Sequence, residues 1–216
     1  MNQPEIPKTF YLTHSYHTTL VDKRIDKIKS LYPEFDIKFY DNNACIKFLE
    51  SNYPNNYVKT FLKLKKGAHK ADFFRYCALY KNGGLYIDLD NILQKNIWSL
   101  VSKYNFTTCL HGGKNRAYRD DLKYNKKSIH QGFIAAEPNF FILKHLIEHM
   151  ISNPVPHKTE FAPFQYHFYV RYFYKYLLDL GKVKELLPST EYLIKEKKIF
   201  LIDTKDTAIM KYGIKK

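Results

Sequence analysis

Residues 67–90 read GAHKADFFRYCALYKNGGLYIDLD, a sequence that predicts a helix, a glycine stop and a strand in direct succession. Apolar residues at helical spacing predict a helix over 68–81. Asn82-Gly83-Gly84 ends it, because glycine adopts the left-handed conformation that often follows a helix C-terminus. A strand over 85–89 follows at once, so the three elements form one supersecondary unit.

The charged side chains of this unit fall on defined faces. Asp72 and Arg75 are three residues apart in the predicted helix, so they share a face. Tyr86, Asp88 and Asp90 alternate with apolar residues, so along a strand they would share the face opposite to the apolar one. Taken alone, Asp72 and Arg75 could be a surface ion pair of about 0.2–0.5 kcal/mol, and a single D-x-D also arises by chance.

The position of the acidic pair favours a functional interpretation. Ligands of open α/β sheets gather at the C-terminal ends of the strands, where Asp88 and Asp90 are expected. Two carboxylates at one place repel each other unless a cation or a basic group compensates them. Because oxygen ligands suit Mg²⁺ and Mn²⁺, the pattern predicts a divalent-cation site at these two residues, with Arg75 nearby.

The rest of the chain predicts strands that alternate with helices, and hence an α/β fold with a partly parallel sheet. Further strands are expected over 10–12, 35–40, 107–110, 132–136 and 199–202, and further helices over 19–31, 42–53, 57–64, 140–151 and 164–180. A polar loop is expected over 112–127 and a frayed basic tail over 212–216. No repeat or linker divides the chain, so we expect a single domain over residues 1–216.

Composition limits the class of protein. An apolar content of 45% with 17% aromatic residues favours a packed globule over a disordered chain. The 35 basic and 21 acidic residues give a net charge of +14, which favours anionic partners such as nucleotides, acidic polymers or an anionic membrane surface. We expect a cytoplasmic protein for three reasons. Its three cysteines form no C-x-x-C motif, it has no apolar run of membrane-spanning length, and it has no secretory signal.

Two alternative functions come from other patterns. His145-Leu146-Ile147-Glu148-His149 matches the H-x-x-E-H motif of zinc peptidases, but its surroundings contain no distinctive third ligand, and its apolar residues form a core stripe. The lysines of 63–70 and 123–127, with aromatic residues nearby, match a basic nucleic-acid-binding surface. No known nucleic-acid-binding motif accompanies them, and charge runs are usually solvated surface, so we expect no nucleic-acid partner.

The run ADFFRYCALYKNGGLYIDLD over 71–90 resembles the D-x-D sugar-binding signature of family-32 glycosyltransferases. That family includes yeast-type α-mannosyltransferases and is similar to the catalytic domain of large clostridial glucosylating toxins. The resemblance extends to Ile6-Pro7-Lys8, to the turn Tyr40–Ala44, and to the segment Ile129–Pro138, where the family often has Asn in place of Gln131.

The resemblance implies a GT-A fold, which is a Rossmann-like nucleotide-binding α/β/α sandwich with a mixed sheet. Residues 1–110 would bind the nucleotide sugar, and 111–216 would form the acceptor side and the basic tail. Among single residues, Asp88, Asp90 and Arg75 would be catalytic, and Asp88 and Asp90 would hold Mn²⁺ or Mg²⁺. The residues implied in binding the nucleotide sugar are Asp72, Arg75, Tyr86, Asp88, Asn43, Leu12, Thr13 and Gln131.

The implied reaction transfers a hexose from a UDP- or GDP-sugar to a hydroxyl of a glycan, protein or lipid acceptor, with retention of anomeric configuration. The last third of the chain departs from the family pattern. Phe161-Ala162-Pro163 stands where the family often has T-G-P, and Ala208-Ile209-Met210 stands where it often has A-I-H. The departure removes a histidine that would otherwise contact the phosphates or the metal.

Overall fold

The computed structural model describes residues 5–111, 128–153, 168–184, 186–187, 189–203 and 209–212. The helices described are α1 Thr19–Leu31, α2 Asn42–Asn52, α3 Asn55–Lys63, α4 Gly67–Asn82, α5 Trp98–Val101, α6 Phe141–Ser152 and α8 Phe168–Gly181. The strands described are β1 Thr9–Thr13, β2 Asp36–Tyr40, β3 Gly84–Ile87, β4 Asn91–Leu93, β5 Phe106–His111, β6 Ser128–Ala136, β7 Thr190–Ile194, β8 Lys197–Asp203 and β9 Met210–Tyr212.

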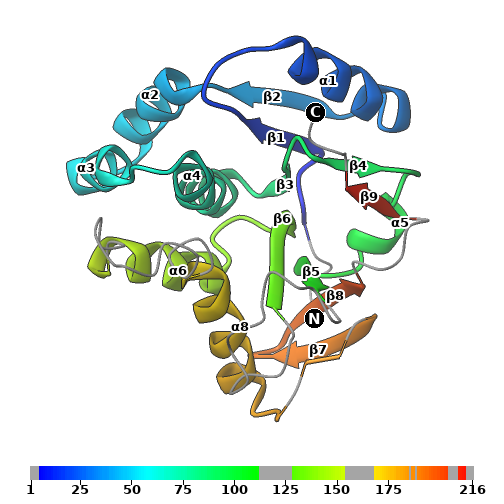
Figure 1. The fold of residues 1–216 in the computed structure, drawn as a ribbon. Helices are drawn as coiled ribbons and strands as arrows, with labels where there is room; N and C mark the ends of the chain where they lie inside the picture. Colours follow the sequence, from blue (N-terminus) through cyan, green and yellow to red (C-terminus); the bar gives the residue numbers. More distant parts are fainter. Residues whose placement is uncertain are drawn as a thin grey trace.

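One seven-stranded sheet, in the order β2-β1-β3-β6-β5-β8-β7, runs through the molecule (Figure 1). The strands β2, β1 and β3 are mutually parallel, β6 is antiparallel to both β3 and β5, and β8 is parallel to β5. A separate two-stranded sheet joins β4 to β9. The α/β class with a mixed sheet, expected from the sequence, is therefore confirmed.

Helices cover both faces of the large sheet (Figure 1). One hydrophobic cluster joins α2, α3, α4, α6 and α8 to side chains such as Tyr11 and Tyr86. A second cluster joins α1 and α5 to side chains such as Phe10 and Leu85, which alternate with the first set along β1 and β3. This alternation is the period-two pattern of a strand buried on both faces, and it produces the α/β/α sandwich that the family resemblance implies.

The glycine pair between α4 and β3 turns the chain from helix to sheet within two residues. Gly83 has φ +66° and Gly84 has φ +104°, both in the region that favours glycine. A Cβ on Gly83 would lie 2.7 Å from Cδ of both Pro7 and Pro138, so space as well as conformation requires glycine there. This turn fixes how Arg75 on α4 faces the residues that follow β3.

Several expected boundaries are corrected by the structure. The strand β3 ends at Ile87, and the Asn91 N–H bonds to the Asp88 carbonyl at 3.0 Å, so Asp88 leaves the sheet and Asp90 lies in a turn. The alternating face expected for Tyr86, Asp88 and Asp90 therefore does not continue to Asp90. β6 begins at residue 128 instead of 132, while β4, β7, β9 and α5 were not predicted.

Other expected segments fall outside the described residues. These are the polar loop 112–127, the start of the helix expected over 164–180, Phe161-Ala162-Pro163, Ala208, and the last four residues of the basic tail. Residue 212, expected in that tail, ends strand β9. Within the described ranges, no helix combines the length and the apolar character needed to cross a membrane.

Candidate functional site

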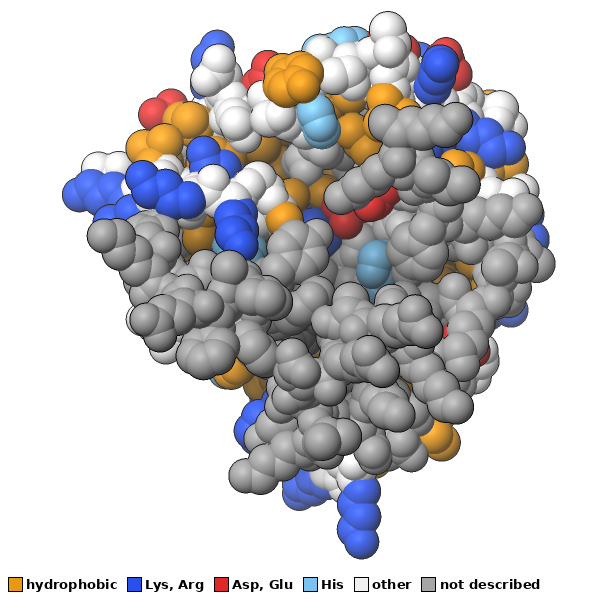
Figure 2. Space-filling view, in the orientation of Figure 1, with side chains coloured by type: hydrophobic (Ala, Val, Ile, Leu, Met, Phe, Trp, Pro, Cys, Tyr) orange, Lys and Arg blue, Asp and Glu red, His pale blue; other side chains and the backbone are white. Residues whose placement is uncertain are grey.

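The candidate site lies where the parallel strands β1, β2 and β3 end. Thr13 ends β1 and is paired with Tyr40 at the end of β2. Asp88 follows the end of β3, and its N–H donates to the Gly132 carbonyl of β6 at 2.8 Å. Because β1 lies between β2 and β3, this edge is a crevice position of the kind where open α/β sheets bind ligands. Figure 2 shows acidic side chains and a histidine close together near the centre of this face.

Arg75 is the central side chain of the site, and it is only 3% exposed. Its Nη2 lies 3.1 Å from Asp72 Oδ1 and 3.1 Å from Asp88 Oδ1. Nε donates to the Ala71 carbonyl at 3.2 Å, and Nη1 donates to the Gln131 carbonyl. The guanidinium carbon also lies 4.4 Å from the centre of the Tyr86 ring, a cation–π arrangement.

These contacts raise the pKa of Arg75. Burial alone would lower the pKa, but the negative charges of Asp88 and Asp72 outweigh burial. A guanidinium offers five donors in a fixed plane, and each of its three nitrogens has a partner here. Arg75 is therefore a fixed positive charge that ties α4 to β6 and to the residue after β3.

Asp88 is held by one of its two carboxylate oxygens, while its other oxygen lies next to Gly132 of β6. Oδ1 accepts from Arg75 at 3.1 Å and from the Tyr86 hydroxyl at 2.8 Å. Because Tyr86 gives its one proton to Asp88, the hydroxyl of Thr13, 2.9 Å away, donates to Tyr86. No described residue donates a hydrogen bond to Oδ2, and the side chain is 30% exposed. Asp88 is thus held in place through Oδ1 while Oδ2 can ligate a cation.

Asp72 lies deeper than Asp88, with 5% of the residue exposed. Burial raises the pKa of its carboxyl to about 7, although Arg75 lowers it, and the nearby Asp88 adds to the rise. Near neutral pH the group can therefore exchange a proton, in contrast to an ordinary aspartate. Such a group can either donate or accept a hydrogen bond with a sugar hydroxyl.

Asp90 occupies a different environment from Asp88. It is partly exposed. Burial lowers the pKa of Arg24 on α1, and the negative charge of Asp90 opposes this effect by raising the pKa. Arg24 Nε also donates to the carbonyl of Leu89, between the two acidic residues. The turn that carries the acidic pair is therefore flanked by one arginine from α4 and one from α1.

The remaining predicted site residues differ in how they can meet a ligand. Thr13 is partly exposed at the end of β1, and Asn43 is exposed in the first turn of α2, which follows β2. Leu12 is fully buried in the cluster on the α1 side of the sheet, which leaves only its backbone for a ligand. Gln131 is 5% exposed, and its side-chain carbonyl accepts from the Tyr76 hydroxyl. Gln131 therefore links β6 to α4.

Sequence reasoning missed three groups at this site. Asn91, directly after the acidic pair, donates from Nδ2 to the Gly132 carbonyl at 2.9 Å and lies 3.0 Å from Nε2 of His130. For Asn91, the available signal was its position directly after the D-x-D. For His130, the signal was that His130 and Gly132 flank Gln131 in the predicted site. Arg24 carries no local signal, because only the fold brings α1 to this turn.

The chemistry of the site suits a hard divalent cation. Asp88 Oδ2 and the Asp90 carboxylate are oxygen ligands, which Mg²⁺ and Mn²⁺ prefer, and these ions commonly take further ligands from substrate phosphates and water. Across the described ranges, no group of three or more His, Cys, Asp or Glu side chains is arranged to hold a metal on its own. A cation held by Asp88 and Asp90 would have room for substrate phosphate and water as further ligands.

The H-x-x-E-H histidines serve the packing of α6 on α8. His145 stacks on Tyr176 with ring centroids 3.8 Å apart, and His149 stacks on Tyr172 with centroids 3.3 Å apart. Nε2 of His145 also lies within hydrogen-bond distance of the Tyr172 hydroxyl. These contacts support the structural interpretation of the motif over a zinc site.

Comparison with known proteins agrees with the geometry. Residues 16–107, which include both arginines and the acidic turn, match the family model described as a glycosyltransferase sugar-binding region containing a DXD motif. An uncharacterised glycosyltransferase of Acanthamoeba polyphaga mimivirus is 31% identical over 116 residues, which are 54% of this chain and 42% of that protein. The initiation-specific α-1,6-mannosyltransferase of Saccharomyces cerevisiae is 38% identical over 76 residues, 34% of this chain and 16% of that enzyme.

Among solved structures, the PaToxG glycosyltransferase aligns with a TM-score of 0.49 and 12% identity, covering 83% of this chain and 72% of that one. In the two curated relatives, by contrast, the matched residues span less than half of the relative's own length. The family match and the two curated relatives confirm the resemblance to DXD glycosyltransferases that the sequence predicts.

Proposed function

We propose that this chain adopts a GT-A fold and transfers a hexose from a nucleoside-diphosphate sugar to an acceptor hydroxyl, with retention at the anomeric carbon. The donor would be a UDP- or GDP-sugar, and the acceptor a glycan, a protein or a lipid. The observation that carries the proposal is the buried Arg75, which joins Asp72 and Asp88 near the C-terminal ends of the parallel strands β1, β2 and β3, within a matched DXD region.

A divalent cation, Mn²⁺ or Mg²⁺, would be held by Asp88 and Asp90. The support is the Asp88 side chain, which is 30% exposed and whose Oδ2 accepts no hydrogen bond from a described residue, together with the partly exposed Asp90 two residues on. When bound, the cation would act as a Lewis acid on the donor diphosphate and stabilise the charge that develops as the glycosidic bond breaks. Arg75 and Tyr86 keep Asp88 in place for this role.

The roles of the other residues follow from their places. Asp72, with its raised pKa, would bond to sugar hydroxyls through either protonation state. Thr13, Asn43 and the backbone of Leu12, which lie at or just beyond the ends of β1 and β2, would bind the nucleoside. Preorganised charges of this kind contribute most where water is excluded, and Arg75 is already out of water.

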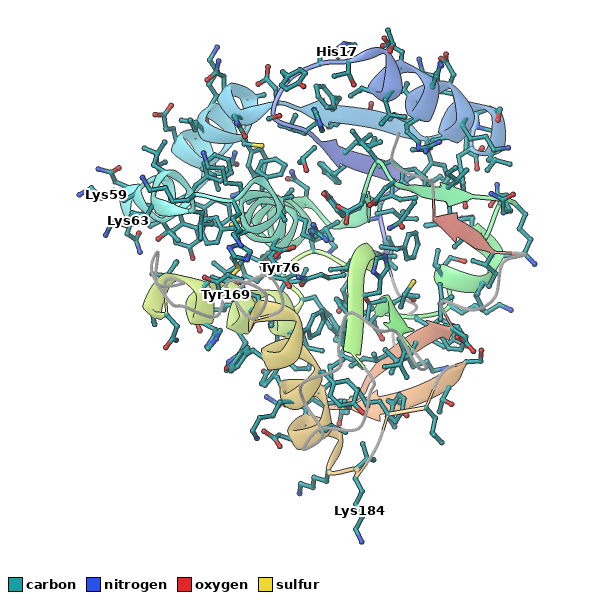
Figure 3. The ribbon with its side chains drawn as sticks, viewed as in Figure 1. His17, Lys59, Lys63, Tyr76, Tyr169 and Lys184 are labelled. Carbon is teal, nitrogen blue, oxygen red and sulfur yellow. The ribbon has the colours of Figure 1, made fainter. Side chains whose placement is uncertain are left out.

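The protein would also associate peripherally with an anionic membrane surface through helix α3. Helix α3 contains no acidic residue, and it carries the exposed Lys59 and Lys63 with Leu62, 54% exposed, between them. Figure 3 shows Lys59 and Lys63 extending outward from the molecule. A basic helix face with an exposed apolar side chain suits weak association with acidic lipid headgroups.

Thermal unfolding in the presence of nucleotide sugars tests the proposal. A ligand that binds only the folded state raises the unfolding temperature by mass action. We expect one of a panel of UDP-, GDP- and other nucleotide sugars to stabilise the protein with Mn²⁺ and much less with EDTA. Absence of any Mn²⁺-dependent stabilisation across the panel would contradict the proposed function.

A further inference from the structure

Asn91 is a buried polar side chain at the base of the acidic turn. It is 1% exposed, and its Nδ2 donates to the Gly132 carbonyl at 2.9 Å. The same carbonyl accepts the backbone N–H of Asp88 at 2.8 Å, and the Asn91 N–H bonds back to the Asp88 carbonyl at 3.0 Å. Two bonds to one carbonyl and one across the turn therefore fasten residues 88–91 to β6.

The amide of Asn91 can be oriented by chemistry alone. A backbone carbonyl only accepts hydrogen bonds, so the atom facing Gly132 must be the amide nitrogen. The second Nδ2 proton then meets Nε2 of His130 at 3.0 Å, and this ring nitrogen must be the acceptor. A His130 that accepts at Nε2 is uncharged and carries its proton on Nδ1.

Gly132 makes this arrangement possible because it has no side chain. A Cβ there would lie 2.4 Å from Asn91 Nδ2, 2.7 Å from Asp88 Oδ2 and 2.7 Å from His130 Nε2. The ends of these three side chains therefore converge on the space that a larger residue would fill. The φ of Gly132 is not in the left-handed region, so the requirement is for space.

The other end of the Asn91 amide shows which part of the side chain matters. Its Oδ1 is buried and has no hydrogen-bond partner among the described residues. A buried acceptor without a partner is costly and calls for an explanation. The explanation is that Nδ2 of the same amide makes two hydrogen bonds, to Gly132 and to His130. An apolar residue at position 91 would avoid the unpartnered oxygen but would lose both of these hydrogen bonds.

We propose that Asn91 is a positioning residue of the site, which clamps the turn bearing Asp88 and Asp90 to β6 and holds His130 neutral with its proton on Nδ1. Its effect on cation binding rests on the proposed function, whereas the state of His130 does not. Groups that position metal ligands typically alter metal affinity by 10- to 100-fold when they are removed.

Nitrogen-15 NMR of the histidine side chains in the ligand-free protein at pH 7 tests the first half of the proposal. His130→Gln identifies the His130 signals by their disappearance. We expect wild-type His130 to show a protonated Nδ1 and an unprotonated Nε2. A doubly protonated ring, or a proton on Nε2, would overturn the proposal without bearing on the transferase reaction.

Asn91→Leu tests the second half, with Asn105→Leu as its matched control. Asn105 is also a buried asparagine, 6% exposed, and it joins the side chain of Glu137, just after β6, to the backbone of Lys198 on β8. We expect Asn91→Leu to abolish the His130 signature and to weaken Mn²⁺ binding with a nucleoside diphosphate about tenfold. We expect Asn105→Leu to change neither. An unaltered His130 in folded Asn91→Leu, or equal losses of Mn²⁺ affinity in the two variants, would overturn the proposal.

Discussion

Arg75 and Asp88 form an ion pair of 3.1 Å in which the arginine is 3% exposed and the aspartate 30% exposed. The pair therefore connects the interior of the protein to the place where a ligand would bind. Every nitrogen of the guanidinium has a partner, so Arg75 cannot move without breaking several contacts at once. The position of Asp88 is thus fixed by the packing of α4 on the sheet.

Arg75→Lys tests this rigid connection. Lysine keeps the charge but offers one nitrogen in place of a planar fork, so it cannot serve Asp72, Asp88 and Gln131 together. We expect the free energy of unfolding to fall by about 3 kcal/mol, since a buried ion pair is disrupted. We also expect the affinity for a nucleoside-diphosphate sugar with Mn²⁺, measured by calorimetry, to fall at least ~10-fold. A folded variant with unchanged affinity would contradict the proposal that the planar guanidinium of Arg75 holds Asp88 in place.

Asp90→Ala separates catalysis from folding. Because Asp90 lies in a partly exposed turn, we expect its removal to change the free energy of unfolding by less than about 1 kcal/mol. Turnover that depends on Mn²⁺ should be lost. Asp179→Ala is the control, since Asp179 is an exposed aspartate on α8 paired with Lys175. Normal turnover in Asp90→Ala would remove Asp90 from the proposed metal site.

The raised pKa of Asp72 predicts how stability depends on pH. The folded state has a pKa of about 7 where the ordinary value is 3.8, so between these values the folded protein binds more protons than the unfolded chain. Stability from this group is fully present below pH 3.8 and declines as pH rises to about 7. Urea unfolding at pH 5 and at pH 7.5 should show a decline on the order of 2 kcal/mol in wild type that is absent in Asp72→Asn. Equal pH dependence in the two proteins would contradict the assigned shift.

The basic face of α3 predicts lipid-dependent binding. Lys59→Glu with Lys63→Glu should reduce the affinity for vesicles containing phosphatidylserine, measured by sedimentation, by at least about 30-fold, because each basic residue near such a surface contributes about 1 kcal/mol. Lys182→Glu with Lys184→Glu is the matched control, because both lysines are exposed and Figure 3 shows Lys184 at the bottom of the molecule, away from Lys59 and Lys63. Equal losses from both variants would indicate a general effect of net charge, and would contradict a specific role for α3.

Much of the fold follows from local sequence signals. The helix over 19–31 is predicted with its observed bounds, and the helix expected over 42–53 begins where Asp41 caps it by accepting from the Ala44 N–H at 2.8 Å. The glycine stop before β3 was also read correctly. These features depend on residues within a few positions of one another, which is where capping, helical spacing and glycine conformation act.

What the sequence could not supply depends on contacts between distant segments. β4 and β9 are short strands that exist because residues 91–93 pair with 210–212, and neither has a distinctive apolar pattern. The early end of β3 reflects the turn closed by Asn91 and held by Gly132 of β6. Likewise, Arg24 reaches the acidic turn only because α1 packs against one face of the sheet.

Binding of Mn²⁺ to wild type and Asp88→Asn, followed by electron paramagnetic resonance with and without a nucleoside diphosphate, tests the central claim most directly. The asparagine keeps the size of the side chain but removes the charge that the cation requires. We predict that Mn²⁺ binds wild type tightly only when the diphosphate is present, and that Asp88→Asn loses this binding while its circular dichroism stays native. Equally tight, diphosphate-dependent binding in Asp88→Asn would contradict the account.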